Sequence, residues 1–186
     1  MKVTADYQLE NEEMQHRQWA QKNGQWQKKA DAGRFAQINK IKGDAKTVLS
    51  IGCGPKEPIG IGATHACDIA FNAQRFLEGS QWKGEFKQCS CDDLPYADKQ
   101  FDFVVCSEVI EHLPEEADIM RTFQEVDRVG KRWLLTTPWI TRKQGNTEKT
   151  HRHFLNEEEI KRIVPDIPMK MERFDIFLFM TGGKDG

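Results

Sequence analysis

The chain has 186 residues, of which 38% are hydrophobic and 10% aromatic, and a formal net charge of −2. This length fits one domain with one core, and the balanced charge gives no reason to expect nucleic acid or a membrane surface as partner. No apolar run is long enough to cross a bilayer, and the first residues lack the apolar stretch of a signal peptide, so we expect no membrane association and a cytoplasmic location. The five cysteines contain no CxxC pair, which is typical of free thiols in a reducing compartment.

Residues 1–44 are polar and carry apolar residues at loosely helical spacing, which predicts a helical cap of one or two helices. Gly24 and Gly33 are expected to interrupt this cap. Two roles stay open for it, namely packing against one face of a sheet and forming a lid over a ligand.

From Thr47 onward, short apolar strands alternate with helices. Strands are predicted at 48–51, 65–69, 84–89, 101–106 and 132–137. One helix is expected to start at Pro114 and end at Gly130, and another to start at Asn156, with Glu159 completing a capping box. Residues 169–180 lack a turn signal and predict one long strand.

This alternation predicts an α/β fold, with a Rossmann-like, mostly parallel sheet covered by helices on both faces. Residues 1–186 are expected to form a single domain, with the α/β core at 45–186. Only 13 residues separate Gly54 from Asp68. We therefore expect the helix after the glycine loop to be shortened to a turn or absent.

A glycine loop, Ile51-Gly52-Cys53-Gly54, follows the first strand, and Asp68 ends the second. Ligands of open α/β sheets bind beyond the carboxyl ends of the strands, where glycines let the backbone approach closely. A carboxylate at the end of the next strand is placed to accept both ribose hydroxyls. These features also serve dinucleotides, so they do not identify the ligand by themselves.

Further blocks narrow the choice: Leu94-Pro95-Tyr96, then FDFVV at 101–105, then EVIEHL at 108–113. Together with VLSIGCGP before and RVGKRWLLTTP after, this order resembles the class I S-adenosylmethionine-dependent methyltransferases, in their small-molecule subgroup. The resemblance covers roughly residues 45–165. It implies S-adenosyl-L-methionine as the cofactor, and this donor has no pyrophosphate to bind at the shortened helix.

The resemblance also implies roles for individual residues. The loop residues would line the methionine part of the donor, Asp68 would hold the ribose, and the adenine would lie between Ile69 and Leu94. Ser90 stands where relatives carry an acid for the adenine amino group, so Asp92 is expected to take over. The donor-binding residues expected in full are Ile51, Gly52, Cys53, Gly54, Asp68, Ile69, Asp92, Asp93, Leu94, Ser107 and Glu108.

Methyl transfer to oxygen usually needs a proton acceptor, for which we consider His112, His151 and His153. Glu108, Glu111 and His112 are spaced so that one helical face could present all three. This spacing, with a distant histidine, is similar to the metal site of small-RNA 2′-O-methyltransferases. The same motif is common in relatives without metal, so no metal ligand is assigned.

The stretch 141–154 follows the fifth strand and is strongly basic. It is either a solvated loop or a recognition element for an anionic or polyhydroxylated substrate, with Trp139 and Arg142 as substrate contacts. The predicted reaction methylates an oxygen or nitrogen of a small polar metabolite, such as a sugar or surface-glycan precursor. The alternatives are a metal-dependent RNA 2′-O-methyltransferase, which the near-neutral charge disfavours, and a donor-binding protein without catalysis. The sequence leaves the oligomeric state open.

Overall fold

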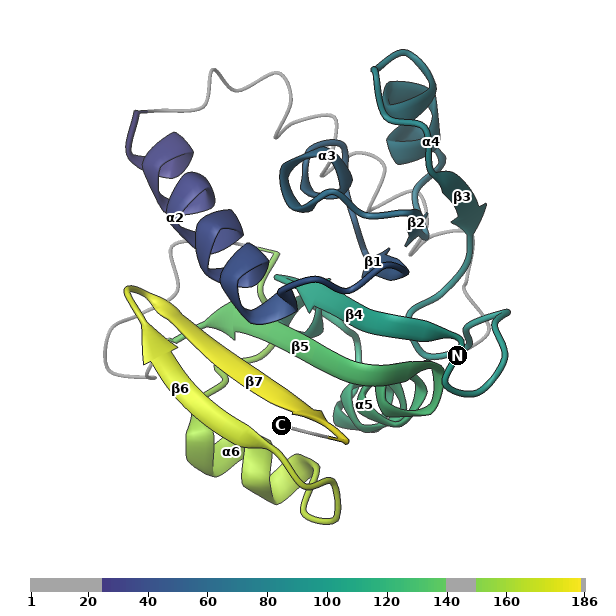
Figure 1. The fold of residues 1–186 in the computed structure, drawn as a ribbon. Coiled ribbons are helices and arrows are strands. Elements are labelled where there is room, and N and C mark those ends of the chain that lie inside the picture. Colours follow the sequence, from purple (N-terminus) through teal and green to yellow (C-terminus); the bar gives the residue numbers. More distant parts are fainter. Residues whose placement is uncertain (1–24, 140–149, 185–186) are drawn as a thin grey trace.

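The computed structural model describes residues 25–139 and 150–184 (Figure 1). Its seven strands form one sheet in the order β3-β2-β1-β4-β5-β7-β6. Strands β1 to β5 are parallel, and β7 runs antiparallel to both β5 and β6. The strands are β1 (Val48–Ile51), β2 (His65–Asp68), β3 (Glu85–Gln88), β4 (Phe101–Ser107), β5 (Gly130–Pro138), β6 (Lys170–Phe174) and β7 (Phe177–Gly183). The mostly parallel α/β sheet is confirmed, and its strand order reverses between β1 and β4.

Helices cover both faces of this sheet, as predicted (Figure 1). In β4, Val104 and Cys106 pack toward α5 and α6, whereas Phe103 and Val105 pack toward α2 and α3. Successive side chains of a strand point to opposite faces of the sheet, so a strand buried on both faces packs alternately against the two layers of helices. The helices are α2 (Gln25–Lys42), α3 (Glu57–Ile61), α4 (Phe71–Glu78), the 3₁₀ turn η1 (Ile110–His112), α5 (Glu116–Val129) and α6 (Glu157–Ile163).

Local capping signals set the helix ends much as expected. Gly130 follows the last residue of α5, and the Asn156 side chain accepts hydrogen bonds from the backbone N–H groups of Glu158 and Glu159 at the start of α6. Helix α5 begins two residues after Pro114, where Glu115 forms a capping box. The helix after the glycine loop is indeed short, because α3 has only five residues.

Helix α2 differs from the prediction, because it continues through Gly33 without a break. An internal glycine costs a helix only about 1 kcal/mol, which tertiary packing readily offsets. That packing comes from Ile38, which is fully buried against β4 and β7. The described part of the cap therefore packs on a sheet face, while Gly24 and residues 1–23 lie outside the described residues.

The C-terminal segment is where the prediction of one long strand was wrong. Strands β6 and β7 form an antiparallel hairpin, with Phe174 paired to Phe177. Asp175 makes the turn possible with a left-handed φ of 53°, a conformation that Asp tolerates better than most residues. No Asn-Gly or Gly pair marks this turn in the sequence, which explains why the pattern concealed it.

None of the helices within the described ranges combines the length and apolar character that a membrane span needs. All five cysteines are free thiols, four of them buried. The treatment of the whole chain as one domain stays a prediction.

Candidate active site at the carboxyl ends of β1 and β4

The glycine loop follows β1, and its two glycines have left-handed backbone conformations, with φ of 59° at Gly52 and 50° at Gly54. A Cβ on Gly52 would overlap Cγ2 of Val109, in the segment after β4. The Asp68 carboxylate secures the loop, since its Oδ2 accepts from the Gly54 N–H at 2.9 Å and its Oδ1 from the Ala70 N–H at 2.8 Å. The loop and the β4 segment are therefore in direct contact at the point where the strand order reverses, which is where ligands of such sheets bind.

Two expected donor contacts in this loop have side chains that point elsewhere. Ile51 is fully buried in the core beside α5, and Cys53 packs against Ala73 and Leu77 of α4. Burial raises the pKa of the Cys53 thiol well above its usual value. The backbone is therefore what these two residues can offer a ligand.

The residues expected around adenine lie on the β2 side of the loop. Ile69 is half-buried directly after β2, and Leu94 is buried, with its N–H donating to Glu125 at 2.8 Å. Asp92 is buried too, accepts from the Ser90 hydroxyl and pairs with Arg121 at 3.3 Å, while Asp93 is exposed. The adenine contact of Asp92 stays a prediction, because the described contacts of its carboxylate hold the turn together.

Glu108 follows β4 and adopts an unusual left-handed φ of 58°. Its Oε1 accepts from the Thr136 hydroxyl at 2.9 Å, and its Oε2 lies 3.6 Å from Nη1 of Arg34. Ser107 exchanges a hydrogen bond of 2.9 Å with the same Thr136 hydroxyl. Burial, reinforced by the nearby Glu111, raises the pKa of Glu108 to about 8.

The idea that Glu108, Glu111 and His112 share one helical face was wrong. The left-handed Glu108 and a 3₁₀ turn of only three residues replace the helix there. Glu108 therefore lies outside the turn that carries Glu111 and His112, and its carboxylate faces Arg34.

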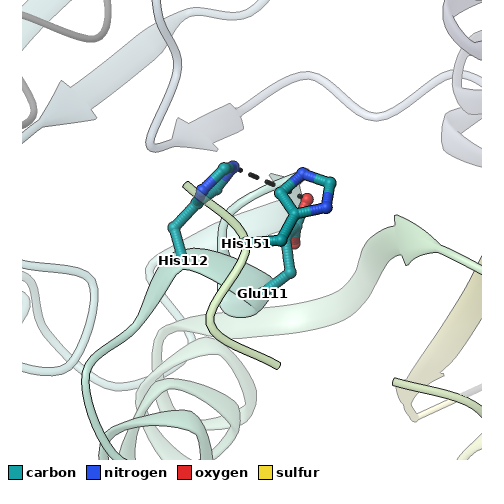
Figure 2. Close-up of side chains that lie close together, drawn as sticks. All are labelled: Glu111, His112 and His151. Atoms are coloured by element: carbon teal, nitrogen blue, oxygen red, sulfur yellow. Dashed lines mark ion pairs between the residues drawn. The ribbon is translucent and has the colours of Figure 1, made fainter. Parts of the chain in front are cut away.

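The turn instead brings Glu111 and His112 together with a residue about 40 positions away, His151 (Figure 2). One potential ligand atom from each residue lies within 4.8 Å of the other two. Glu111 Oε1 is 3.8 Å from His112 Nε2, and the two imidazole rings meet edge to face with centroids 4.9 Å apart. Glu111 is 1% exposed, and burial raises its pKa to about 7. We call Glu111, His112 and His151 the EHH cluster.

The other expected contacts lie outside the EHH cluster. His153 donates from Nε2 to the Leu113 carbonyl at 2.9 Å. Trp139 donates from its indole N–H to Glu157 at 2.8 Å, and the Arg173 guanidinium lies over its ring at 3.5 Å from the centroid. Arg142 lies outside the described residues. The catalytic role of His153 and the substrate contacts of Trp139 and Arg142 stay predictions.

Sequence reasoning missed two charged residues close to the site. Glu57 starts α3, is 5% exposed and accepts from the Ser50 hydroxyl at 2.8 Å. Burial raises the pKa of Glu57 to about 7, against the lowering effect of Arg34 from α2. A hint was available for Glu57, which is the first acid after the glycine loop, but nothing local distinguishes Arg34 from the other cations of the cap.

Comparisons with known proteins agree with this geometry. Residues 49–132 match the model of a methyltransferase domain. The chain is 25% identical over 142 residues to a ubiquinone biosynthesis O-methyltransferase of Aeromonas salmonicida, covering 60% of this chain. The match spans about half (56%) of that relative's length.

Solved structures share the fold at low sequence identity. A protein of Pyrococcus horikoshii superposes with a TM-score of 0.65 and 16% identity, over 86% of this chain and 91% of that one. An S-adenosylmethionine-dependent methyltransferase of Methanosarcina mazei does so with a TM-score of 0.59 and 21% identity, over 78% and 94% of the two chains. The family resemblance and the Rossmann-like fold expected from the sequence are thereby confirmed.

Proposed function

We propose that this chain is a class I S-adenosylmethionine-dependent methyltransferase, as its match to a methyltransferase domain over residues 49–132 supports, and that it moves the donor's methyl group to an oxygen or nitrogen of a small polar metabolite. The observation that carries this proposal is the EHH cluster, which adjoins the contact between the glycine loop and the β4 segment. Polar groups that converge where an open α/β sheet binds its ligand are the expected setting for catalysis.

The charge of this region suits the donor. S-adenosylmethionine carries a positive sulfonium and a positive amino group. Two buried carboxyl groups, Glu57 and Glu111, and the partly buried Glu108 are gathered around Arg34 and the carboxyl ends of β1 and β4. A cationic ligand would offset the cost of ionising carboxyl groups out of contact with water.

Methyl transfer requires the acceptor atom in line with the methyl carbon and the sulfur, so positioning contributes much of the rate. The C–S bond breaks, with its electron pair staying on sulfur, as the bond from the acceptor to the methyl carbon forms. A hydroxyl acceptor also loses its proton. The EHH cluster offers a carboxylate and two imidazoles for handling that acceptor.

The donor contacts are assigned to the loop backbone at Gly52 and Gly54, to Asp68 for the ribose, and to Ile69 and Leu94 for the adenine. The acceptor is assigned to the small polar or anionic metabolites, including sugars and surface-glycan precursors, and not to nucleic acid. The Aeromonas salmonicida relative is named as an O-methyltransferase, which supports oxygen as the atom methylated. We place the protein in the cytoplasm.

The test has two parts, donor binding and turnover. Calorimetry with S-adenosylhomocysteine should give one site per chain, and the Asp68→Asn variant should weaken it. Incubation with S-adenosylmethionine and a panel of sugars, phenols, amines and an RNA oligonucleotide should release S-adenosylhomocysteine with a small metabolite. Binding without turnover on the whole panel would favour a non-catalytic donor-binding protein, and turnover on RNA alone would refute the small-molecule acceptor.

A further inference from the structure

We infer that the EHH cluster is a binding site for one divalent transition-metal ion, which holds the acceptor oxygen during methyl transfer. The metal site stands on the geometry of the cluster alone. The part about the acceptor rests on the proposed function.

The three side chains form a mixed set of one carboxylate and two imidazoles. Ions such as Zn²⁺, Mn²⁺ and Fe²⁺ bind such sets, whereas Mg²⁺ prefers oxygen ligands alone. With metal–ligand bonds of about 2.1 Å, two ligands of one tetrahedral ion lie about 3.4 Å apart. The separation of 3.8 Å between Glu111 Oε1 and His112 Nε2 is close to that value. All three ligand atoms lie within 4.8 Å, so an ion would draw them together by about 1 Å.

The Glu111 carboxylate is oriented as a ligand. Its Oε2 accepts from the Thr137 hydroxyl at 3.2 Å, which leaves Oε1 facing the histidines. Oε1 is buried and accepts no hydrogen bond from any of the described residues. A buried carboxylate oxygen without a donor is costly, and a bound cation would remove that cost.

Backbone contacts orient His112 and bring His151 to it. The Thr150 carbonyl lies 3.1 Å from His112 Nδ1, and because a carbonyl only accepts, Nδ1 carries the proton. Nε2, which faces Glu111, is then the unprotonated nitrogen that a metal needs. The Glu111 carbonyl accepts from the N–H groups of Arg152 and His153, at 2.8 and 3.2 Å, and ties the segment after His151 to η1. The site thus has the outer-shell contacts that fix metal ligands.

Three protein ligands leave coordination positions open for a substrate. Val109, two residues before Glu111, touches Gly52 of the loop assigned to the donor, so the turn that carries two of the three ligands is in contact with that loop. Coordination lowers the pKa of a hydroxyl, which then loses its proton to solvent and attacks the methyl carbon. An ion that accepts five or six ligands, such as Mn²⁺, has at least two of these positions open and favours acceptors that chelate through two neighbouring oxygens, namely vicinal diols and catechols.

The decisive measurement is metal binding by the full chain without donor or acceptor. After dialysis against chelator, each metal is titrated separately by calorimetry. Zn²⁺ should bind at one site per chain, Mn²⁺ should bind at one site with lower affinity, and Mg²⁺ should bind with lower affinity than Mn²⁺. Glu111→Gln and His151→Ala should each lower Mn²⁺ affinity at least about tenfold, and the outer-shell change Thr137→Val should lower it about 10-fold or more. His65→Gln is the matched control, because His65 lies at the start of β2 and contacts Thr64 and Glu85. Thermal melts without metal check that each variant folds.

The outcomes separate the site from the reaction. Absence of stoichiometric Zn²⁺ and Mn²⁺ binding, or equal loss in His65→Gln, overturns the metal site even if the protein methylates a metabolite. Metal binding that depends on the EHH cluster, in a protein that never turns over the donor, keeps the site and refutes the proposed function. Chelator-sensitive turnover of a vicinal diol or catechol, restored by Mn²⁺, supports both; turnover unaffected by chelator overturns the role in holding the acceptor.

Discussion

Gly52 and Gly54 share a left-handed backbone but differ in the space around them, so alanine at each position isolates one physical effect. Alanine in this conformation costs about 1–2 kcal/mol, which applies at both sites. A Cβ on Gly54 would have no heavy atom within 4 Å, whereas a Cβ on Gly52 would overlap Val109 Cγ2 and lie 3.3 Å from Cγ1. Overpacking of that kind adds about 1–3 kcal/mol. We therefore expect Gly52→Ala to destabilise the fold by about 2–5 kcal/mol and Gly54→Ala by about 1–2 kcal/mol.

Urea denaturation followed by tryptophan fluorescence and circular dichroism measures both losses. The double variant Gly52→Ala/Val109→Ala removes the overlapping methyl groups and should recover about 1–3 kcal/mol relative to the additive sum. Equal destabilisation by the two single variants, or no recovery in the double variant, would refute the reasoning that the loop and the β4 segment are packed against each other at Gly52.

Three other variants test neighbouring parts of the site. Asp68→Asn should weaken S-adenosylhomocysteine binding about tenfold in calorimetry, because the amide replaces one carboxylate oxygen that holds the loop; unchanged affinity would argue against Asp68 as a ribose ligand. Glu57, whose pKa burial raises from 4.5 to about 7, stays protonated in the fold while it ionises in the unfolded chain. The free energy of unfolding should therefore fall by up to about 3 kcal/mol between pH 4.5 and 7. Urea titrations at several pH values should show that Glu57→Gln lacks this part of the fall; the same pH dependence as wild type would contradict the reasoning. Arg128→Met should destabilise by about 2 kcal/mol, since its guanidinium donates to the Leu94 carbonyl at 3.0 Å and to Glu125. A loss below about 0.5 kcal/mol in the same titration would show that these contacts are replaced by water.

Features decided by near neighbours in the chain were predictable from the sequence. The apolar run at 101–106 is long enough to be a buried strand, and Asn156 provides the hydrogen bonds that start α6. The short distance from Gly54 to Asp68 leaves room for only the brief α3. The order of these blocks also carried the resemblance to methyltransferases, which the match of residues 49–132 to a methyltransferase domain bears out.

Tertiary structure alone decided what depends on distant partners. The hairpin turn at Asp175 joins β6 to β7, and β7 also pairs with β5, an arrangement that no local turn signal indicates. Glu57 and Glu108 acquire raised pKa values because the fold buries their carboxyl groups, and Arg34 from α2 opposes part of that rise. The EHH cluster joins η1 to a residue about 40 positions later through backbone hydrogen bonds to Glu111. Spacing along the chain cannot encode such a meeting, since it is set by where the sheet places the two segments.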